Sequence, residues 1–397
     1  MTKPQQRQKT LTEARNLKMA RSAHAYVRGS TVKFYEWLGS SRRCQFPDGP
    51  AVWICGDCHV GNLGPIADAK GRVLIQIRDL DQTVIGNPAH DLIRLGLSLA
   101  SASRGPDLPG VTTAKILEEL ISGYRSALSG NFETDKDNSH EPKSIQTLLA
   151  QSTRRRWRHL AEERLDSVKP VIPLGKRFWA LVPAERKALS QMLEDDSVRA
   201  TLSSLRGRSK DEPIELLDAA YWMKGCSSLG RLRYAAILRI GNGKNSNSCL
   251  VDIKEGVAPA APPTPKVQMP RDNAIRVVTG AKALSPNLGE RMVASKLLGK
   301  AVVMRELMPQ DLKIEVSRLS PEEAISLANY LARVVGRSHG RQMTPGQRRT
   351  WRSDLGKSHK ASLVAPSWLW ASVVELIGLH EAAYLEHCRR FALAAAA

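Results

Sequence analysis

The sequence predicts an α+β protein of two lobes, a larger helical lobe and a smaller lobe with an antiparallel sheet over residues 225–307. Long stretches with apolar residues at helical spacing fill residues 10–215 and 315–397. Between them, alternating apolar runs at 232–240 and 249–254 flank a Gly-Asn-Gly-Lys-Asn segment, which is a strong hairpin signal. The predicted boundaries are 1–215 for the first helical part, 216–315 for the sheet lobe, and 316–397 for C-terminal helices that pack on the first part.

The bulk composition predicts a cytoplasmic protein that attracts polyanions. The chain has 397 residues, 42% of them apolar, and a formal net charge of +20, which attracts nucleotides, nucleic acids or anionic lipids. Its basic residues are spread along the chain and no nucleic-acid-binding module stands out, so nucleic acid is a permitted partner but not a specified one. No apolar stretch is long enough to cross a bilayer. Six cysteines and a polar N-terminus without a secretory signature predict reduced thiols.

Helical patterns dominate the first and last parts of the chain. A first helix is predicted to begin at Thr10 or Thr12, either of which can cap it, and to break near Gly29 before it continues to about Leu38. Further predictions are helices at 88–102 and 112–128, a loop at 130–143, helical segments over 144–205, a loop at 206–213, a helix over 321–338 capped by Ser320, and a last helix over 367–396.

Residues 51–95 carry the polar groups on which the functional prediction depends. Two predicted strands, at 52–54 and 73–77, are each followed by polar side chains. Phosphoryl transfer needs such a set, because one carboxylate accepts the proton of the attacking hydroxyl, while an amide and another carboxylate hold Mg²⁺ against the triphosphate. The prediction is Asp57 as the base, with Asn62, Asp79 and Asp81 as Mg²⁺ ligands.

Other interpretations of the same stretch compete with this one. Residues 55–59 formally match the C-x-x-C-H pattern of haem attachment and the C-x-x-C redox motif. Haem attachment of this type needs export, and the second cysteine of a dithiol site should open a helix, whereas Gly61 and Asn62 follow here. A purely structural turn of Gly, Asp and Asn between two core strands is the stronger alternative. It explains one polar cluster but not a second cluster at the next strand end.

The sheet lobe is predicted to bind nucleotide phosphates. The turn at 225–230 opens a hairpin whose second strand ends at Lys254, which is the layout of a kinase nucleotide lobe. Each signal is weak alone, since a single Gly-x-x-x-x-Gly turn is common and a lone strand lysine is usually a surface residue. Asp252 stands where kinases usually place a small alanine beside adenine, which leaves the choice of nucleotide open. The predicted nucleotide contacts are Gly225, Ser227, Ser228, Gly230 and Lys254.

The segment after the hairpin supplies a candidate partner for Lys254. The predictions are a Pro- and Ala-rich loop at 257–270, a mainly helical segment over 276–298 with an interruption at Pro286, a strand at 301–307 and a hinge at Pro309. Glu290, in the helical segment, could pair with Lys254 as the helix-C glutamate of kinases does. Glu255 is a rival for the same role.

The motifs between residues 56 and 92 resemble those of aminoglycoside-phosphotransferase-like kinases. They are Gly56-Asp57-x-His59-x-x-Asn62, Asp79-x-Asp81 and Gly86-Asn87-Pro88-Ala89-x-Asp91-Leu92. More closely, the whole chain resembles the bacterial DUF2252 family, which is assigned to the protein-kinase-like superfamily, through Met19-x-x-Ser22-x-x-Ala25-x-x-Arg28-Gly29 and the Lys254-Glu255 pair. The resemblance implies that Arg28 faces the active-site turn and that Asp91 accepts hydrogen bonds from the catalytic loop. The alternatives are a surface arginine and a carboxylate that complements a helix dipole.

The order of the motifs along the chain is unusual for a kinase. In a kinase the nucleotide lobe comes first, whereas here the catalytic loop lies near residue 57 and the lysine near 254. The resemblance therefore implies a circularly permuted, two-lobed protein-kinase-like fold, which is permissible because lobes pack by contacts and not by chain order. The predicted function is an ATP- and Mg²⁺-dependent phosphotransferase acting on a hydroxyl of a small molecule or protein. The alternatives are a nucleotide-binding pseudoenzyme and a basic nucleic-acid-associated protein.

Overall fold

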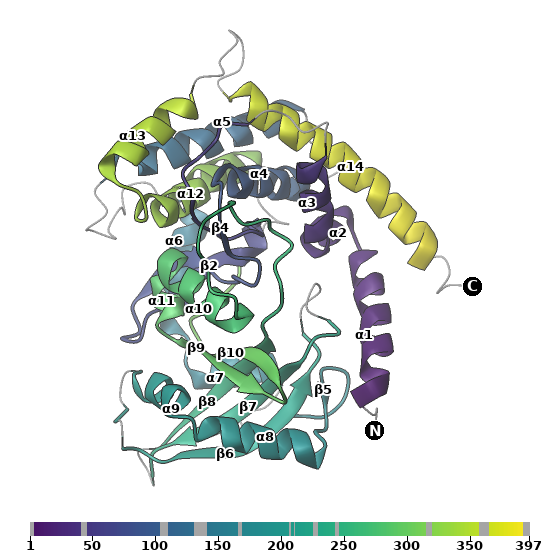
Figure 1. The fold of residues 1–397 in the computed structure, drawn as a ribbon, viewed down its shortest axis with the longest axis vertical. Coiled ribbons are helices and arrows are strands. Elements are labelled where there is room, and N and C mark those ends of the chain that lie inside the picture. Colours follow the sequence, from purple (N-terminus) through teal and green to yellow (C-terminus); the bar gives the residue numbers. More distant parts are fainter. Residues whose placement is uncertain are drawn as a thin grey trace.

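A computed structural model shows helices at one end of the molecule and a sheet at the other (Figure 1). The structure describes residues 4–40, 46–103, 110–130, 141–165, 169–205, 208–209, 211–224, 229–242, 246–314, 320–356 and 365–391. The predicted α+β class, with a large helical part and an antiparallel sheet, is confirmed. Within these residues no helix has the combined length and apolar character that a membrane span requires.

Within the described residues, the main sheet has six strands. They are β5 (Phe178–Trp179), β6 (Ile214–Trp222), β7 (Arg233–Ile240), β8 (Asn247–Glu255), β9 (Met292–Leu297) and β10 (Lys300–Leu307). Their order is β5-β6-β7-β8-β10-β9, and every neighbouring pair is antiparallel. The strands predicted at 232–240, 249–254 and 301–307 are confirmed. The sheet extends beyond the predicted range, because β5 and β6 precede residue 225.

The prediction of a mainly helical segment over 276–298 is wrong at its C-terminal end. Helices α10 (Asn273–Leu284) and α11 (Pro286–Gly289) cover its first part, but β9 follows them. A two-residue turn, Leu298-Gly299, joins β9 to β10 with φ values of 51° and 76°. Hairpin turns of this kind need positive φ and usually contain Asn, Asp or Gly. A leucine at the first turn position conceals the hairpin from a sequence pattern.

The two faces of the sheet pack against different helices. Side chains alternate along a strand, and Val251 and Ile253 of β8 join a cluster that includes residues of α8 (Pro183–Leu193) and α9 (Asp196–Ser203). Leu250 joins a second cluster with residues of α7 (Trp157–Leu165). The alternation therefore places Lys254 on the face away from α8 and α9. These two helices lie in the range predicted for the first helical part, yet they cover the sheet.

The helical end of the molecule contains the remaining helices. They are α2 (Ala23–Gly29), α3 (Thr31–Gly39), α4 (Ala89–Ser103), α5 (Gly110–Ala127), α6 (Lys143–Arg154), α12 (Pro321–Gly340), α13 (Pro345–Asp354) and α14 (Ser367–Phe391). The predicted break near Gly29 is confirmed by the boundary between α2 and α3. The predicted cap at Ser320 is also confirmed, because its hydroxyl accepts a hydrogen bond from the Glu323 amide.

Helix α1 (Pro4–Met19) connects the two ends of the molecule (Figure 1). At the sheet end, Arg7 forms a buried ion pair of 2.7 Å with Glu185 of α8. At the other end, the hydroxyl of Tyr384 in α14 donates a hydrogen bond of 3.1 Å to the carbonyl of Ala20. The helix begins well before the predicted caps at residues 10 and 12, and proline is favourable in a first helical turn.

Helices α5 and α12 approach each other closely at glycine positions. A Cβ atom on Gly123 would overlap the backbone carbonyl of Asn329 in α12. We expect Gly123→Ala to lower the free energy of unfolding by about 1–3 kcal/mol, since backbone atoms would have to separate. The control is Gly378→Ala in α14, where an added Cβ meets no atom within 4 Å. It should be neutral or up to about 1 kcal/mol stabilising. Equal urea midpoints for the two variants would contradict the prediction.

Candidate functional site

Two small antiparallel strand pairs hold the polar loops of the candidate site. Strands β1 (Val52–Ile54) and β4 (Val84–Gly86) form one pair, and β2 (Leu63–Ala67) and β3 (Val73–Ile77) form the other. The loop after β1 meets the loop after β3 at Gly56, where an added Cβ would overlap the carbonyl of Gln82. Gly56 also has a φ of 74°, which favours glycine. The close crossing brings the loop that carries Asp57 next to the loop that carries Asp79.

The structure brings Lys254 to the acidic loop after β3. The Lys254 ammonium lies 3.5 Å from a carboxylate oxygen of Asp79 and forms an ion pair with Asp81. Burial would raise the pKa of Asp79, but Lys254 and nearby arginines outweigh it and hold that pKa below its usual value. Burial and the neighbouring Asp79 raise the pKa of Asp81. The lysine therefore partly neutralises two adjacent carboxylates, although it belongs to a distant strand.

Asp57 lies at the base of the site in an ion pair with Arg94 of α4. The Arg94 Nε atom lies 2.9 Å from Asp57 Oδ1, and the second carboxylate oxygen lies 3.9 Å from His59 Nε2. Burial raises the pKa of Asp57, and Arg94 opposes this shift. The Asn62 amide donates a hydrogen bond of 3.1 Å to the Asp57 carbonyl. Sequence patterns did not identify Arg94, which follows Asp91 by one helical turn.

Asp91 supports the loop after β1, as the family resemblance implied. Its carboxylate accepts hydrogen bonds of 2.7 and 3.0 Å from the backbone amides of Cys55 and Gly56. His339 of α12 lies 3.2 Å from the same carboxylate, and the other ring nitrogen of His339 lies 2.9 Å from the Tyr124 hydroxyl. These groups are almost fully buried. They join the loop to α4, α5 and α12 through one network of polar contacts.

Arg276 also binds the loop that carries Asp79 and Asp81. Its guanidinium donates hydrogen bonds to the carbonyls of Thr83, Asp81 and Val257, and its side chain is buried. Arg276 belongs to α10, so the helix after β8 fixes the loop that pairs with Lys254. The sequence predicted no role for this residue, because the acceptors are backbone atoms and carry no sequence signal.

A cavity of about 360 Å³ opens in front of Asp57, Asn62 and Asp79. Its other lining residues are mostly cationic. Those from the described part of the chain are Lys18, Arg28, Arg78, Arg164, Lys224, Arg233, Arg305 and Lys313. Arg28 packs on the loop after β1, where its guanidinium carbon would lie 3.0 Å from a Cβ at Gly61. The implied position of Arg28 beside the turn that carries Asp57 and Asn62 is therefore confirmed.

Burial, together with neighbouring cations, lowers the pKa of several basic groups that line the cavity. Desolvation and the neighbouring cations Arg78 and Arg28 lower the pKa of Lys313 to about 8. Burial lowers the pKa of Arg78 to about 10. Burial and the nearby cation Arg28 hold the pKa of His59 well below its usual value. The cavity is therefore a region of strong positive potential, even though two carboxylates line it.

Asp252 neutralises the sheet side of this cavity. Arg233 donates hydrogen bonds of 2.8 and 2.6 Å to its two carboxylate oxygens, and Arg305 lies 3.6 Å away. Burial would raise the pKa of Asp252, but Arg233 and its cationic neighbours outweigh this and lower it. The residue that departs from the kinase pattern therefore acts as the buried partner of two arginines.

Several predicted site residues lie elsewhere or outside the described chain. Gly225, Ser227 and Ser228 fall in the range 225–228, which the structure does not describe. Gly230 has a φ of 93° and lies beside Gln8 of α1. Glu290 is exposed at the end of α11. Glu255 pairs with Lys300 at 2.9 Å, so the carboxylates that contact Lys254 are those of Asp79 and Asp81.

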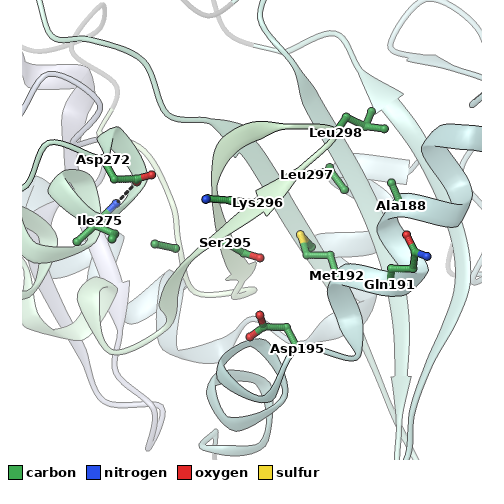
Figure 2. Close-up of a pocket in the computed structure, with 11 residues that line it drawn as sticks. Ala188, Gln191, Met192, Asp195, Asp272, Ile275, Ser295, Lys296, Leu297 and Leu298 are labelled. Carbon is green, nitrogen blue, oxygen red and sulfur yellow. Dashed lines mark hydrogen bonds between the residues drawn. The ribbon is translucent and has the colours of Figure 1, made fainter.

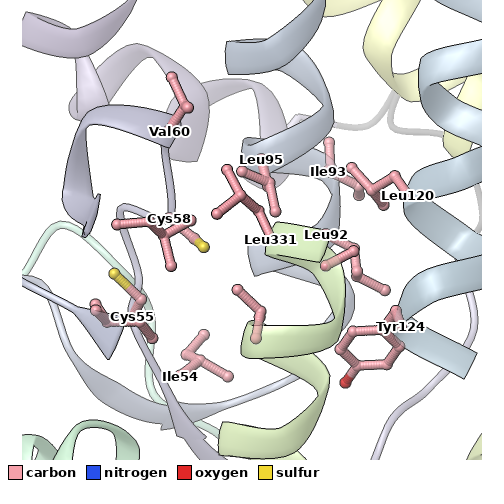
Figure 3. Close-up of a cluster of buried hydrophobic side chains, with 14 of the residues drawn as sticks. Ile54, Cys55, Cys58, Val60, Leu92, Ile93, Leu95, Leu120, Tyr124 and Leu331 are labelled. Atoms are coloured by element: carbon pink, nitrogen blue, oxygen red, sulfur yellow. The ribbon is translucent and has the colours of Figure 1, made fainter. Parts of the chain in front are cut away.

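The two cysteines on either side of Asp57 are part of the hydrophobic core. Cys55 and Cys58 are buried among residues such as Ile54, Leu95 and Leu331 (Figure 3). Both are free thiols. The hydrogen bond between the two thiols and burial both raise the pKa of Cys55. The same hydrogen bond lowers the pKa of Cys58, but burial and nearby carboxylates outweigh it and raise that pKa. Reactive redox cysteines have a lowered pKa and some exposure, so these two are typical of structural core cysteines.

The donor set of the site fits a magnesium ion that is shared with a ligand. Within the described residues, no three His, Cys, Asp or Glu side chains converge as a complete metal site. Mg²⁺ needs no such cage, because it is usually bound by one or two carboxylates, waters and substrate phosphates. Asn62 and Asp79 line one cavity. The Asn62 amide nitrogen is turned to the Asp57 carbonyl, which directs its amide oxygen elsewhere.

A separate hollow of about 440 Å³ lies away from these residues, between α8, α9, α10 and the edge strand β9 (Figure 2). Its two carboxylates, Asp195 and Asp272, each accept hydrogen bonds from the first turn of their own helix. Both are therefore occupied as N-caps. The hollow offers no convergent set of catalytic groups.

Comparison with known proteins assigns the chain to a family. Residues 7–390 match the model of a family described as an uncharacterized protein conserved in bacteria (DUF2252), so the chain belongs to the DUF2252 family. Neither a search of curated proteins nor a search of solved structures found a match.

Proposed function

We propose that this member of the DUF2252 family is an ATP-dependent phosphotransferase that transfers a phosphoryl group to a hydroxyl. The observation that carries the proposal is the contact of Lys254 with Asp79 and Asp81, at the edge of a cavity lined by Asp57 and Asn62. Three separate parts of the sequence supply these groups. A structural turn alone would not need a partly buried lysine from a distant strand.

The order of elements around Lys254 supports a kinase-like arrangement. Lys254 lies on β8, the third strand of the β6-β7-β8 meander, and α10 follows it. Kinases place their phosphate-binding lysine on the third strand, with helix C after it. The catalytic loop precedes this lobe in the chain, so the proposed fold is a circular permutation of the kinase-like one. Among the described residues no glutamate of a helix pairs with Lys254, which is a departure from the kinase pattern, and Arg276 lies on α10 instead.

The proposed mechanism uses the chain's residues for positioning and proton transfer. Asp57 accepts the proton of the attacking hydroxyl through the carboxylate oxygen that Arg94 does not bind. Its raised pKa brings the base closer to neutral pH, which favours proton transfer. Asn62 and Asp79 would hold Mg²⁺, which supplies charge neutralisation at the triphosphate when bound. When the nucleotide binds, its phosphates would replace the carboxylates of Asp79 and Asp81 as the partners of the Lys254 ammonium.

Lys254→Met tests the nucleotide side of the proposal. We expect the variant to weaken Mg-ATP binding and lower kcat/KM, each by about tenfold or more, because a charged phosphate contact is lost. Calorimetry and an ATP-consumption assay against a metabolite panel provide the two measurements. The control is Lys300→Met, which removes an exposed strand lysine. If both variants bind Mg-ATP as the wild type does, Lys254 has no role in nucleotide binding and the proposal fails.

A nucleotide-binding pseudoenzyme is the second candidate. The ion pair between Asp57 and Arg94 favours it, since Arg94 occupies one carboxylate oxygen and opposes the rise in the pKa of Asp57. The same assays separate the two functions. Tight Mg-ATP binding that depends on Lys254 and Asp79, without turnover of any acceptor, would assign the chain to the second class.

A further inference from the structure

We infer that the acceptor of this phosphotransferase is a small molecule that already carries a phosphate group, bound by the cationic cavity beside Asp57. The inference rests on the proposed function and adds the chemical class of the second substrate. Its basis is the division of the site into two hollows with different linings.

The first hollow is the one that Lys254 lines. It is narrow, and its lining combines Lys254, Asp81 and apolar side chains such as Val277 and Val303. Its volume of about 20 Å³ is too small for a nucleotide base. In the proposal this hollow therefore receives only the phosphate end of the donor nucleotide, where Lys254 meets it. Lys254 does not line the larger cavity in front of Asp57.

The second hollow is the cationic cavity. It shares Arg78, Asp79 and Arg305 with the first hollow, so the two meet at the residue proposed to hold Mg²⁺. Asp57 lines only the cationic cavity. A base must lie within hydrogen-bond reach of the hydroxyl that it activates. The acceptor therefore occupies the cationic cavity, and the transferred phosphoryl group passes near Asp79.

The cavity has more cationic groups than its own carboxylates satisfy. Asp252 forms ion pairs with Arg233 and with Arg305 and so neutralises part of their charge. Arg78 donates a hydrogen bond to the Asp311 carbonyl and Arg164 pairs with Glu163. The Nε atoms of Arg28, Arg78 and Arg164 are nevertheless buried and have no hydrogen-bond partner among the described residues. Buried donors of this kind normally find an acceptor. A phosphate dianion supplies several acceptor oxygens and matches the fork geometry of arginine.

The size of the cavity selects a small phosphate ester over a nucleic acid. About 360 Å³ lies near the lower end of the range for small-molecule sites. A polynucleotide backbone is expected to bind along a stripe of cations on a surface. The cations here instead surround a recess.

The test is a titration of glycerol 3-phosphate, with glycerol as the matched neutral compound. It is performed on the full chain saturated with Mg²⁺ and a non-hydrolysable ATP analogue, so that the nucleotide site is blocked. We expect binding of glycerol 3-phosphate but not of glycerol. Arg28→Gln and Lys313→Gln should each weaken that binding about tenfold or more and leave the affinity for the ATP analogue within about twofold. Arg158→Gln, an exposed arginine on α7, is the control and should change neither affinity.

The outcomes separate this inference from the proposed function. Equal losses of ATP-analogue and phosphate-ester affinity in Arg28→Gln would assign the cavity to the nucleotide and overturn the inference. Ester binding that is insensitive to Arg28 and Lys313, no ester binding, or displacement of the ester by duplex DNA at equal phosphate concentration would also overturn it. Failure of the ATP analogue to bind, measured separately without ester, overturns the proposed function and with it the acceptor role.

Discussion

Asp57→Asn is expected to lower kcat by roughly 10²- to 10⁴-fold, which is the contribution of a positioned general base. Nucleotide affinity should stay within a few-fold of the wild-type value, because a base acts in the transition state more than in binding. The wild-type rate should fall as the pH drops through the pKa of Asp57, which burial raises and Arg94 opposes. The protonated carboxyl cannot accept a proton, so this acid limb should be absent in the variant.

The control for this prediction is Asp211→Asn, which changes an exposed aspartate before β6. Asp57→Asn also leaves the buried Arg94 without a charged partner, so thermal unfolding is measured alongside the rate. A folded Asp57→Asn protein with wild-type kcat would show that Asp57 is not the base.

Asp91→Ala is expected to have the largest effect on stability, a loss of about 2–5 kcal/mol in the free energy of unfolding. The change leaves the backbone amides of Cys55 and Gly56, and the buried His339, without their acceptor. Asp91→Asn should fall between the wild type and alanine, since one acceptor oxygen remains. Chemical denaturation followed by tryptophan fluorescence gives the values.

The matched control is Asp195→Ala. Asp195 also accepts hydrogen bonds from two backbone amides, but at the exposed start of α9, so its loss should cost only about 1 kcal/mol. A cost for Asp91→Ala no greater than that for Asp195→Ala would show that the polar network beneath the catalytic loop does not hold the fold together.

Local patterns in the sequence determined much of the fold and the outline of the site. Helical periodicity located α4, α5, α12 and α14, and strand alternation located β7 and β8, because both patterns depend on neighbouring residues. The motif from Gly56 to Asp91 identified the acidic and amide groups of the loops, and the support of the catalytic loop by Asp91 followed from it.

Only the tertiary structure decided how these parts combine. It paired Lys254 with Asp79 and Asp81 and not with Glu290 or Glu255, because strand register and the packing of α10 set which carboxylate comes within reach. It also assembled the cationic cavity from α1, α2, α7, the loop after β3, and residues in or after β6, β7 and β10. The arginines and lysines of these segments look like surface residues in sequence. Charge contacts between distant segments leave no periodicity, so they emerge only when the chain is folded.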